Sequence, residues 1–126
     1  MEEHEVYSAA GQDAFHRLAA AFYRQVPLDD VLGPMYPPGE LAEAEQRLRD
    51  FLIYRFGGPP LYIEQRGHPR LRARHFPFAI TPVARDRWML LMSRALDEVR
   101  LPPEPGRILR EFFGAMSTFL INRPSP

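Results

Sequence analysis

The segment Arg66-Gly67-His68-Pro69-Arg70-Leu71-Arg72-Ala73-Arg74-His75-Phe76-Pro77-Phe78-Ala79-Ile80 determines how the rest of the chain is interpreted. It contains four arginines and two histidines, and it turns apolar directly after His75. A basic run that ends in a histidine followed by phenylalanines is unusual for a solvated surface. The pattern is typical of a cofactor site. A basic nitrogen and apolar side chains with cations beside them can bind an apolar group that has an anionic edge.

The pattern around His75 leaves two interpretations open. His75 is either the axial ligand of a haem or, as is more common for a lone histidine beside aromatic residues, an ordinary core or loop residue. His68 competes as a ligand, but Gly67 and Pro69 beside it predict a tight turn with backbone hydrogen bonds. A zinc centre is not expected, because a cluster of three or four ligands is missing.

Composition limits the classes of protein that the chain can represent. Its 126 residues predict one domain spanning residues 1–126. The formal net charge of +0 gives no reason to expect a nucleic acid or a membrane surface as partner. Without cysteine, the chain has no disulfides, iron–sulfur clusters or covalently attached c-type haem, so any haem is held non-covalently.

The first residues of the chain and the absence of known catalytic motifs further limit the possible functions. Residues 1–5 are acidic and lack an apolar run, so no signal peptide or membrane span is expected and a cytoplasmic location is the prediction. There is no nucleophile elbow, no glycine-rich phosphate loop and no pair of carboxylates on an apolar face. Hydrolytic and nucleotide-dependent enzymes are therefore poorly supported, and no catalytic residue is assigned.

Four segments carry apolar residues at spacings of three and four, the pattern of a buried helix face. No segment alternates apolar and polar residues with a period of two, so the predicted fold class is all-α. The inner face of the last segment is expected to include Phe119. The expected helices cover residues 11–26, 40–56, 82–99 and 106–121.

Proline and glycine define the breaks between these helices. Thr81-Pro82 is a typical helix start, whereas Pro103 and Pro105 are expected to interrupt the chain before Gly106. Residues 61–80 are expected to form a long irregular connection with short helical turns at best. Connections of this length in a compact domain are usually functional.

Several polar side chains fall on or near predicted inner faces. A buried Tyr23 hydroxyl and Trp88 indole N–H each need a partner, which a polar ligand in the core would supply. A guanidinium pairs bidentately with a carboxylate, so an arginine of this segment could bind a haem propionate. Arg74 is a better candidate than the other arginines of residues 66–80, because it is adjacent to His75. Arg47 lies at the edge of an inner face and could reach the same side.

The chain resembles the truncated haemoglobins of the second group, the O type, from about Phe15 to Asn122. The run from Glu64 to His75 is the most specific part. Ala10-Gly11 keeps only one of the two glycines that the family often has at this bend. The matching pieces are Phe22-Tyr23, Val31-Leu32, Tyr36-Pro37, Ala44-Glu45-x-Arg47-Leu48-x-x-Phe51-Leu52, Gly57-Gly58-Pro59, Tyr62-x-Glu64-Gln65-Arg66-Gly67-His68-Pro69-Arg70-Leu71-Arg72-x-Arg74-His75, Pro77-Phe78 and Arg85-Asp86-x-Trp88.

The resemblance implies a globin-like two-over-two helical sandwich around haem b, with His75 as the iron ligand. On the opposite haem face it implies three polar side chains that stabilise a bound gas: Tyr23, Tyr36 and Trp88. Ala44 would stand where many globins carry a distal histidine. Other residues implied to contact the cofactor are Arg47, Leu48, Phe51, Arg74, Phe78 and Ile80.

The implied function is binding of O₂, CO or NO at a five-coordinate iron, with high O₂ affinity and slow release. This suits sensing or redox chemistry, such as detoxification of NO or peroxide, better than O₂ storage, and oxygen transport is also expected of such a globin. Turnover would need an external reductase, because the sequence has no flavin or nicotinamide motif. The alternative is a helical interaction module without a cofactor, and the sequence leaves monomer and homodimer open.

Overall fold

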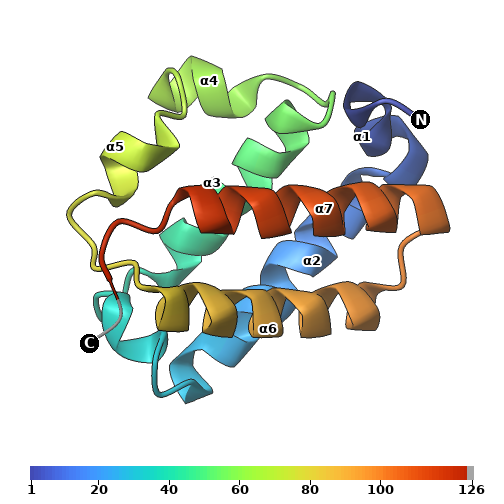
Figure 1. Ribbon diagram of the computed structural model, residues 1–126. Coiled ribbons are helices and arrows are strands. Elements are labelled where there is room, and N and C mark those ends of the chain that lie inside the picture. Colours follow the sequence, from blue (N-terminus) through green and yellow to red (C-terminus); the bar gives the residue numbers. More distant parts are fainter. Residues whose placement is uncertain (125–126) are drawn as a thin grey trace.

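The computed structural model describes residues 1–124, which form α-helices joined by loops and short 3-10 turns (Figure 1). The all-α class predicted from the sequence is therefore confirmed. Within the described residues, no helix is long and apolar enough to cross a lipid bilayer. The elements are η1 Glu3–Glu5, α1 Val6–Ala10, α2 Gln12–Gln25, η2 Val26–Leu28, η3 Gly33–Met35, α3 Leu41–Arg55, α4 Leu61–Arg66, α5 Leu71–His75, α6 Pro82–Val99 and α7 Pro103–Phe119.

The four long helices form two pairs, one laid over the other. Helix α2 packs on both α3 and α6, and α6 packs on α7. Figure 1 shows α6 and α7 side by side, crossing over α2 and α3. The shared core is rich in phenylalanine, and each fully buried side chain of this size contributes roughly 1.5–3 kcal/mol. Its largest fully buried apolar side chains include Phe15, Leu18, Phe22, Leu52, Phe56, Leu91, Met92 and Leu109.

Two glycines allow the N-terminal segment to fold back on this body. Gly11 has a φ of 88° and makes the bend between α1 and α2, so one glycine is sufficient there. Gly57 has a φ of 99°, and a Cβ on it would collide with the carbonyl of His4. The Tyr7 amide donates to the Phe56 carbonyl at 3.0 Å, which fixes α1 on the end of α3.

The predicted long helices lie where expected, but two details of the last one were wrong. Helix α7 begins at Pro103, so Pro103 and Pro105 lie in its first turn. Proline is tolerated there because first-turn amides have no intrahelical partner. Phe119 is 54% exposed, because Ser117 occupies the buried face of the last turn and accepts from Arg85 Nε at 3.0 Å. The predicted start of α6 is confirmed by Thr81 Oγ1, which accepts from the Ala84 amide at 3.0 Å.

Candidate haem site

His75 ends the short helix α5, and one hydrogen bond determines how its ring can act. Its Nδ1 lies 2.7 Å from the Leu71 carbonyl oxygen, one helical turn earlier. A carbonyl only accepts, so Nδ1 carries the proton and a neutral ring keeps its lone pair on Nε2. Metal-binding histidines are commonly fixed in this way through their other nitrogen. The site thus contains an oriented imidazole whose Nε2 is chemically suited to a metal.

The segment that carries His75 is held at the C-terminal end by Asn122. The Asn122 side chain donates from Nδ2 to the His75 carbonyl at 3.2 Å and accepts on Oδ1 from the Ile80 amide at 2.9 Å. Its backbone amide also donates to the Ile80 carbonyl at 2.9 Å. This role of Asn122 is not predictable from the sequence, because an asparagine after an apolar run carries no signal of a partner 47 residues away.

Arg74 closes the turn between α4 and α5. Its Nη2 donates to the Arg66 carbonyl at 2.7 Å and more weakly to the His68 carbonyl at 3.4 Å. Its guanidinium carbon lies 5.9 Å from the centre of the Tyr62 ring. His68 is exposed, as its predicted place in a tight turn implies. Binding of a propionate by Arg74 stays a prediction, and such binding would act beside this structural role.

Three polar aromatic side chains from separate segments are linked by ring contacts, two of them through Phe22. The rings of Tyr23 and Tyr36 stand edge to face with their centres 5.6 Å apart. Phe22 lies 4.9 Å from the Tyr23 ring and 5.1 Å from the Trp88 ring, again between centres. The structure thus joins the three predicted gas-stabilising residues into one cluster. Phe22, which the sequence analysis did not single out for this role, connects them.

The environment keeps both tyrosines protonated. Burial raises the pKa of Tyr23 well above its usual value, and the charge and hydroxyl of Tyr36 raise it further. Burial also raises the pKa of Tyr36. The hydrogen bond with the Tyr23 hydroxyl and the positive charge of Arg47 lower this pKa, but burial outweighs them. Arg47 therefore lies close enough to act on both tyrosines, although its ion pair with Glu43 is long, at 3.9 Å. Both phenols remain hydrogen-bond donors at neutral pH.

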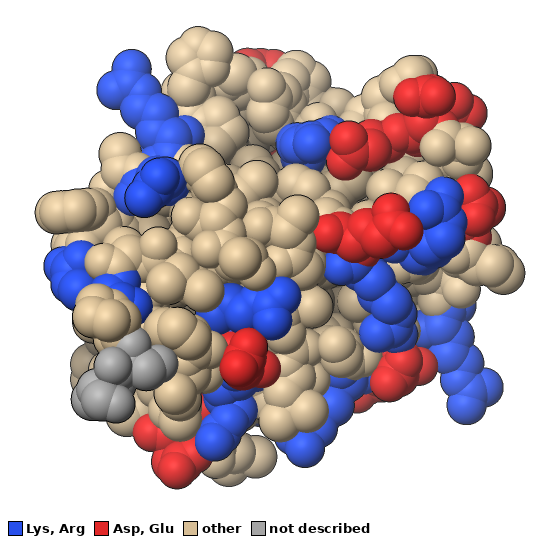
Figure 2. All heavy atoms as spheres, viewed as in Figure 1, with Lys and Arg blue, Asp and Glu red and all other residues tan. Residues whose placement is uncertain are grey.

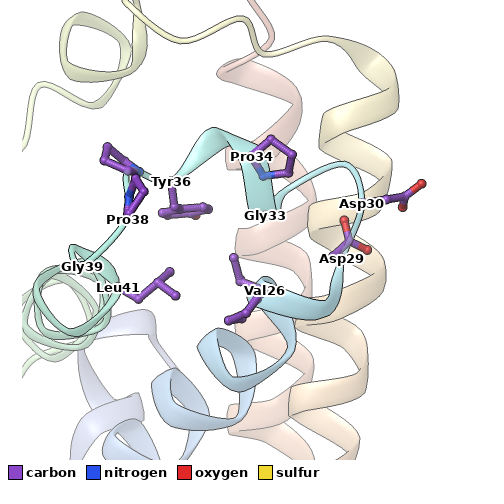
Figure 3. Close-up of a pocket in the computed structure, with 11 residues that line it drawn as sticks. Val26, Asp29, Asp30, Gly33, Pro34, Tyr36, Pro38, Gly39 and Leu41 are labelled. Atoms are coloured by element: carbon purple, nitrogen blue, oxygen red, sulfur yellow. The ribbon is translucent and has the colours of Figure 1, made fainter.

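The loop before Tyr36 is anchored to α6 by an ion pair. Asp29 Oδ2 accepts from the amides of Val31 and Leu32 at 3.0 and 2.8 Å, and its Oδ1 accepts from Arg87 Nη1 at 2.8 Å. This loop lines a hollow of about 430 Å³. Figure 3 shows the Tyr36 ring among the side chains around it. Arg87 is next to Trp88 in α6, so the anchor fixes the start of the loop that leads to Tyr36 near Trp88.

The predicted apolar contacts come from α3 and from the loop after α5. Ala44, Leu48 and Phe51 recur at helical spacing on α3; Ala44 and Phe51 are buried and Leu48 is half-buried. The Phe51 ring lies 5.6 Å from that of Tyr62, which joins α3 to α4. Phe78 is 43% exposed and presents apolar surface close to His75 in the chain.

These residues fit a haem. The imidazole with its available Nε2 can ligate the iron, the apolar side chains can contact the macrocycle, and the phenols can donate hydrogen bonds to a bound gas. In addition, Arg66 Nε is a buried donor without a hydrogen-bond partner in residues 1–124. A carboxylate at the edge of a bound group would satisfy such a donor.

Comparison with known proteins identifies the family. The model of the bacterial-like globins matches residues 5–121. The group 2 truncated hemoglobin YjbI of Bacillus subtilis is 41% identical over 111 residues, which are 87% of this chain and 80% of that protein. The chain belongs to the bacterial-like globins and, within them, to the second group of truncated haemoglobins. Globins bind haem, so family membership implies haem-based gas binding.

Two solved structures support the same assignment. A thermostable hemoglobin from the actinobacterium Thermobifida fusca is 45% identical and has a TM-score of 0.91, with 95% of this chain and 98% of that chain covered. A truncated oxygen-avid haemoglobin from Bacillus subtilis is 36% identical and has a TM-score of 0.88, covering 93% of this chain and 98% of that one. The two pairs of long helices described above are thus the two-over-two sandwich of truncated globins.

Proposed function

We propose that this globin binds haem b through Nε2 of His75 and holds O₂ with high affinity and slow release. The observation that carries the proposal is the hydrogen bond from His75 Nδ1 to the Leu71 carbonyl, because it fixes the tautomer that leaves Nε2 free to ligate. When bound, ferrous haem supplies an open coordination position for O₂, CO or NO. Arg66, Arg74 and Arg47 are the proposed partners of its propionates.

The aromatic cluster would select among these gases. A ligand oxygen that gains partial negative charge accepts hydrogen bonds from the Tyr23 and Tyr36 hydroxyls and the Trp88 indole, and CO gains less from the same donors. Each charge-assisted hydrogen bond is worth about 1.5–3 kcal/mol, or roughly ten- to hundredfold in dissociation rate. The similarity to an oxygen-avid haemoglobin supports this direction. Ala44 is small enough to leave a short route to the site, and bulky Trp88 would obstruct a longer one.

Slow release favours redox chemistry over delivery of O₂. Oxidation of NO by O₂ and reduction of peroxide both fit this proposal, and both need electrons from another protein because the sequence has no flavin or nicotinamide motif.

The test is the O₂ dissociation rate of the haem-loaded protein, measured by stopped flow after mixing with excess CO. Tyr23→Phe and Trp88→Leu each remove one donor, so O₂ release should accelerate about tenfold or more. CO dissociation, measured by NO replacement, should change much less. Equal changes for both gases would show that the side chains act by packing alone and would refute their role as donors. A pyridine haemochrome spectrum checks that the cofactor is haem b.

A further inference from the structure

One face of the molecule carries arginines that the protein does not neutralise. We call it the arginine face; it comprises Arg66, Arg70, Arg72, Arg74 and Arg123. None of the five has a carboxylate within 4.0 Å among residues 1–124. Most other arginines are paired: Arg87 pairs with both Asp29 and Asp30, and Arg107 pairs with both Glu104 and Glu111. Arg94 and Arg100, near the end of α6, also lack a carboxylate within 4.0 Å among residues 1–124. Because Arg66 and Arg74 are the proposed partners of the propionates, the positive charge left for another partner is that of Arg70, Arg72 and Arg123.

Aromatic rings hold several of these arginines in place. The guanidinium carbon of Arg72 lies 5.1 Å from the centre of the Phe119 ring, and that of Arg123 lies 5.3 Å from the Phe76 ring. A ring orders a guanidinium without cancelling its charge, unlike a carboxylate. Both rings lie at the surface, with Phe119 54% and Phe76 64% exposed. Figure 2 shows basic side chains without acidic neighbours over the region of α5, and both signs interspersed over the right half.

The uneven charge has a consequence for association. The whole chain has a formal net charge of +0, so the excess of positive charge on this face is balanced elsewhere on the molecule. Such a distribution orients an acidic partner and increases its association rate. A long nucleic acid gains less, because its binding depends on many phosphate contacts and the rest of the molecule does not extend the basic surface.

We propose that the arginine face is the docking surface for an acidic protein that donates single electrons. Arg70, Arg72 and Arg74 belong to the same loop and helix as His75, so a partner docked there would lie next to the proposed iron ligand. The partner's reduced flavin would give up one electron, and a haem held by His75 would supply the ferric iron that accepts it; the arginines would bind and orient the partner. This inference rests on the proposed haem function and names the class of reductase that the function requires.

The chain offers a matched pair of double variants to test the proposal. Arg70→Asp with Arg123→Glu reverses two charges on the arginine face and leaves out the proposed propionate ligands. Arg70 is left-handed, with a φ of 43°, a conformation that aspartate tolerates. The control is Arg100→Asp with Arg94→Glu, at the far end of α6. Arg100 is also left-handed, with a φ of 58°, and both control residues are exposed. Net charge changes equally in the two double variants.

The first readout is the rate at which a reduced, acidic flavodoxin reduces the ferric haem-loaded protein in stopped flow. For the wild type and the control, the rate constant should fall steeply as ionic strength rises. In the arginine-face variant it should be at least tenfold lower at low salt and nearly independent of ionic strength. Reduction by dithionite, a small reagent that needs no docking surface, should be equal in all three proteins.

The second readout is equilibrium binding of oxidised flavodoxin to the haem-loaded proteins, by calorimetry at low salt. The arginine-face variant should bind at least tenfold more weakly than the control. Equal rates and affinities for the two double variants would overturn the docking proposal, as would a single-stranded oligonucleotide that binds this face more tightly than flavodoxin does. These outcomes leave the haem function standing, whereas failure of all three proteins to take up haem would overturn both proposals.

Discussion

The two sides of the candidate haem site are built in different ways. On one side, Tyr23, Tyr36 and Trp88 are joined by ring packing through Phe22, which lies in the core with an exposed fraction of 0%. On the other side, α5 makes few contacts with the long helices and depends on single hydrogen bonds from Asn122 and Arg74. The difference teaches that apolar packing fixes the aromatic cluster proposed to contact the gas, whereas a few polar contacts orient the histidine.

The largest expected effect comes from removing the centre of the packed side. Phe22→Ala should lower the free energy of unfolding by about 3–5 kcal/mol, because it leaves a cavity between Tyr23 and Trp88. Urea unfolding of the apoprotein followed by circular dichroism measures this change. Phe119→Ala is the matched control; its side chain is 54% exposed, so it should cost far less. Equal losses would contradict the central position of Phe22.

A smaller and more selective effect is expected on the hydrogen-bonded side. Asn122→Ala removes the side-chain bonds to the His75 carbonyl and the Ile80 amide, worth about 1–3 kcal/mol together. We expect haem to transfer to excess apomyoglobin about tenfold faster, with little change in unfolding of the apoprotein.

Asn122→Asp provides the graded comparison. It keeps the acceptor for the Ile80 amide but loses the donor to His75, so its rate of haem loss should be intermediate. If Asn122→Ala destabilised the apoprotein as much as Phe22→Ala does, the contrast between the two sides would be wrong.

The smallest predicted effect depends on pH and concerns the anchor of the Tyr36 loop. Burial opposes ionisation of Asp29, but the amides of Leu32 and Val31 and the Arg87 guanidinium outweigh it, so its pKa is lowered from 3.8. A lowered pKa stabilises the native state above the ordinary pKa, and this is lost as pH falls through the native value. Asp29→Asn should therefore cost about 1 kcal/mol at pH 6, and the difference should shrink as the pH falls below 3.8 toward the lowered native pKa. A difference that persists in acid would contradict the role of the charge.

The packed side was more predictable from sequence than the other side. Apolar spacing in α2, α3, α6 and α7 reports which residues face the core, and so the four long helices could be placed. Residues 61–80 lack such spacing, and their two short helices were foreseen only as helical turns. Phe119 was misplaced because periodicity alone does not reveal that Ser117 bonds Arg85. Asn122 was missed because a single long-range hydrogen bond leaves no pattern in the chain.

The most direct test of the central claim is a haemin titration of the purified protein, followed by dithionite and CO and read by absorption. The wild type should bind one haem per chain with a sharp Soret band at roughly 400–430 nm. His75→Ala should lose this band or hold haem weakly, while His68→Ala, on the same loop but exposed, should behave as the wild type does. An unchanged spectrum in His75→Ala, or a wild type that never takes up haem, would contradict the assignment of His75 as the iron ligand.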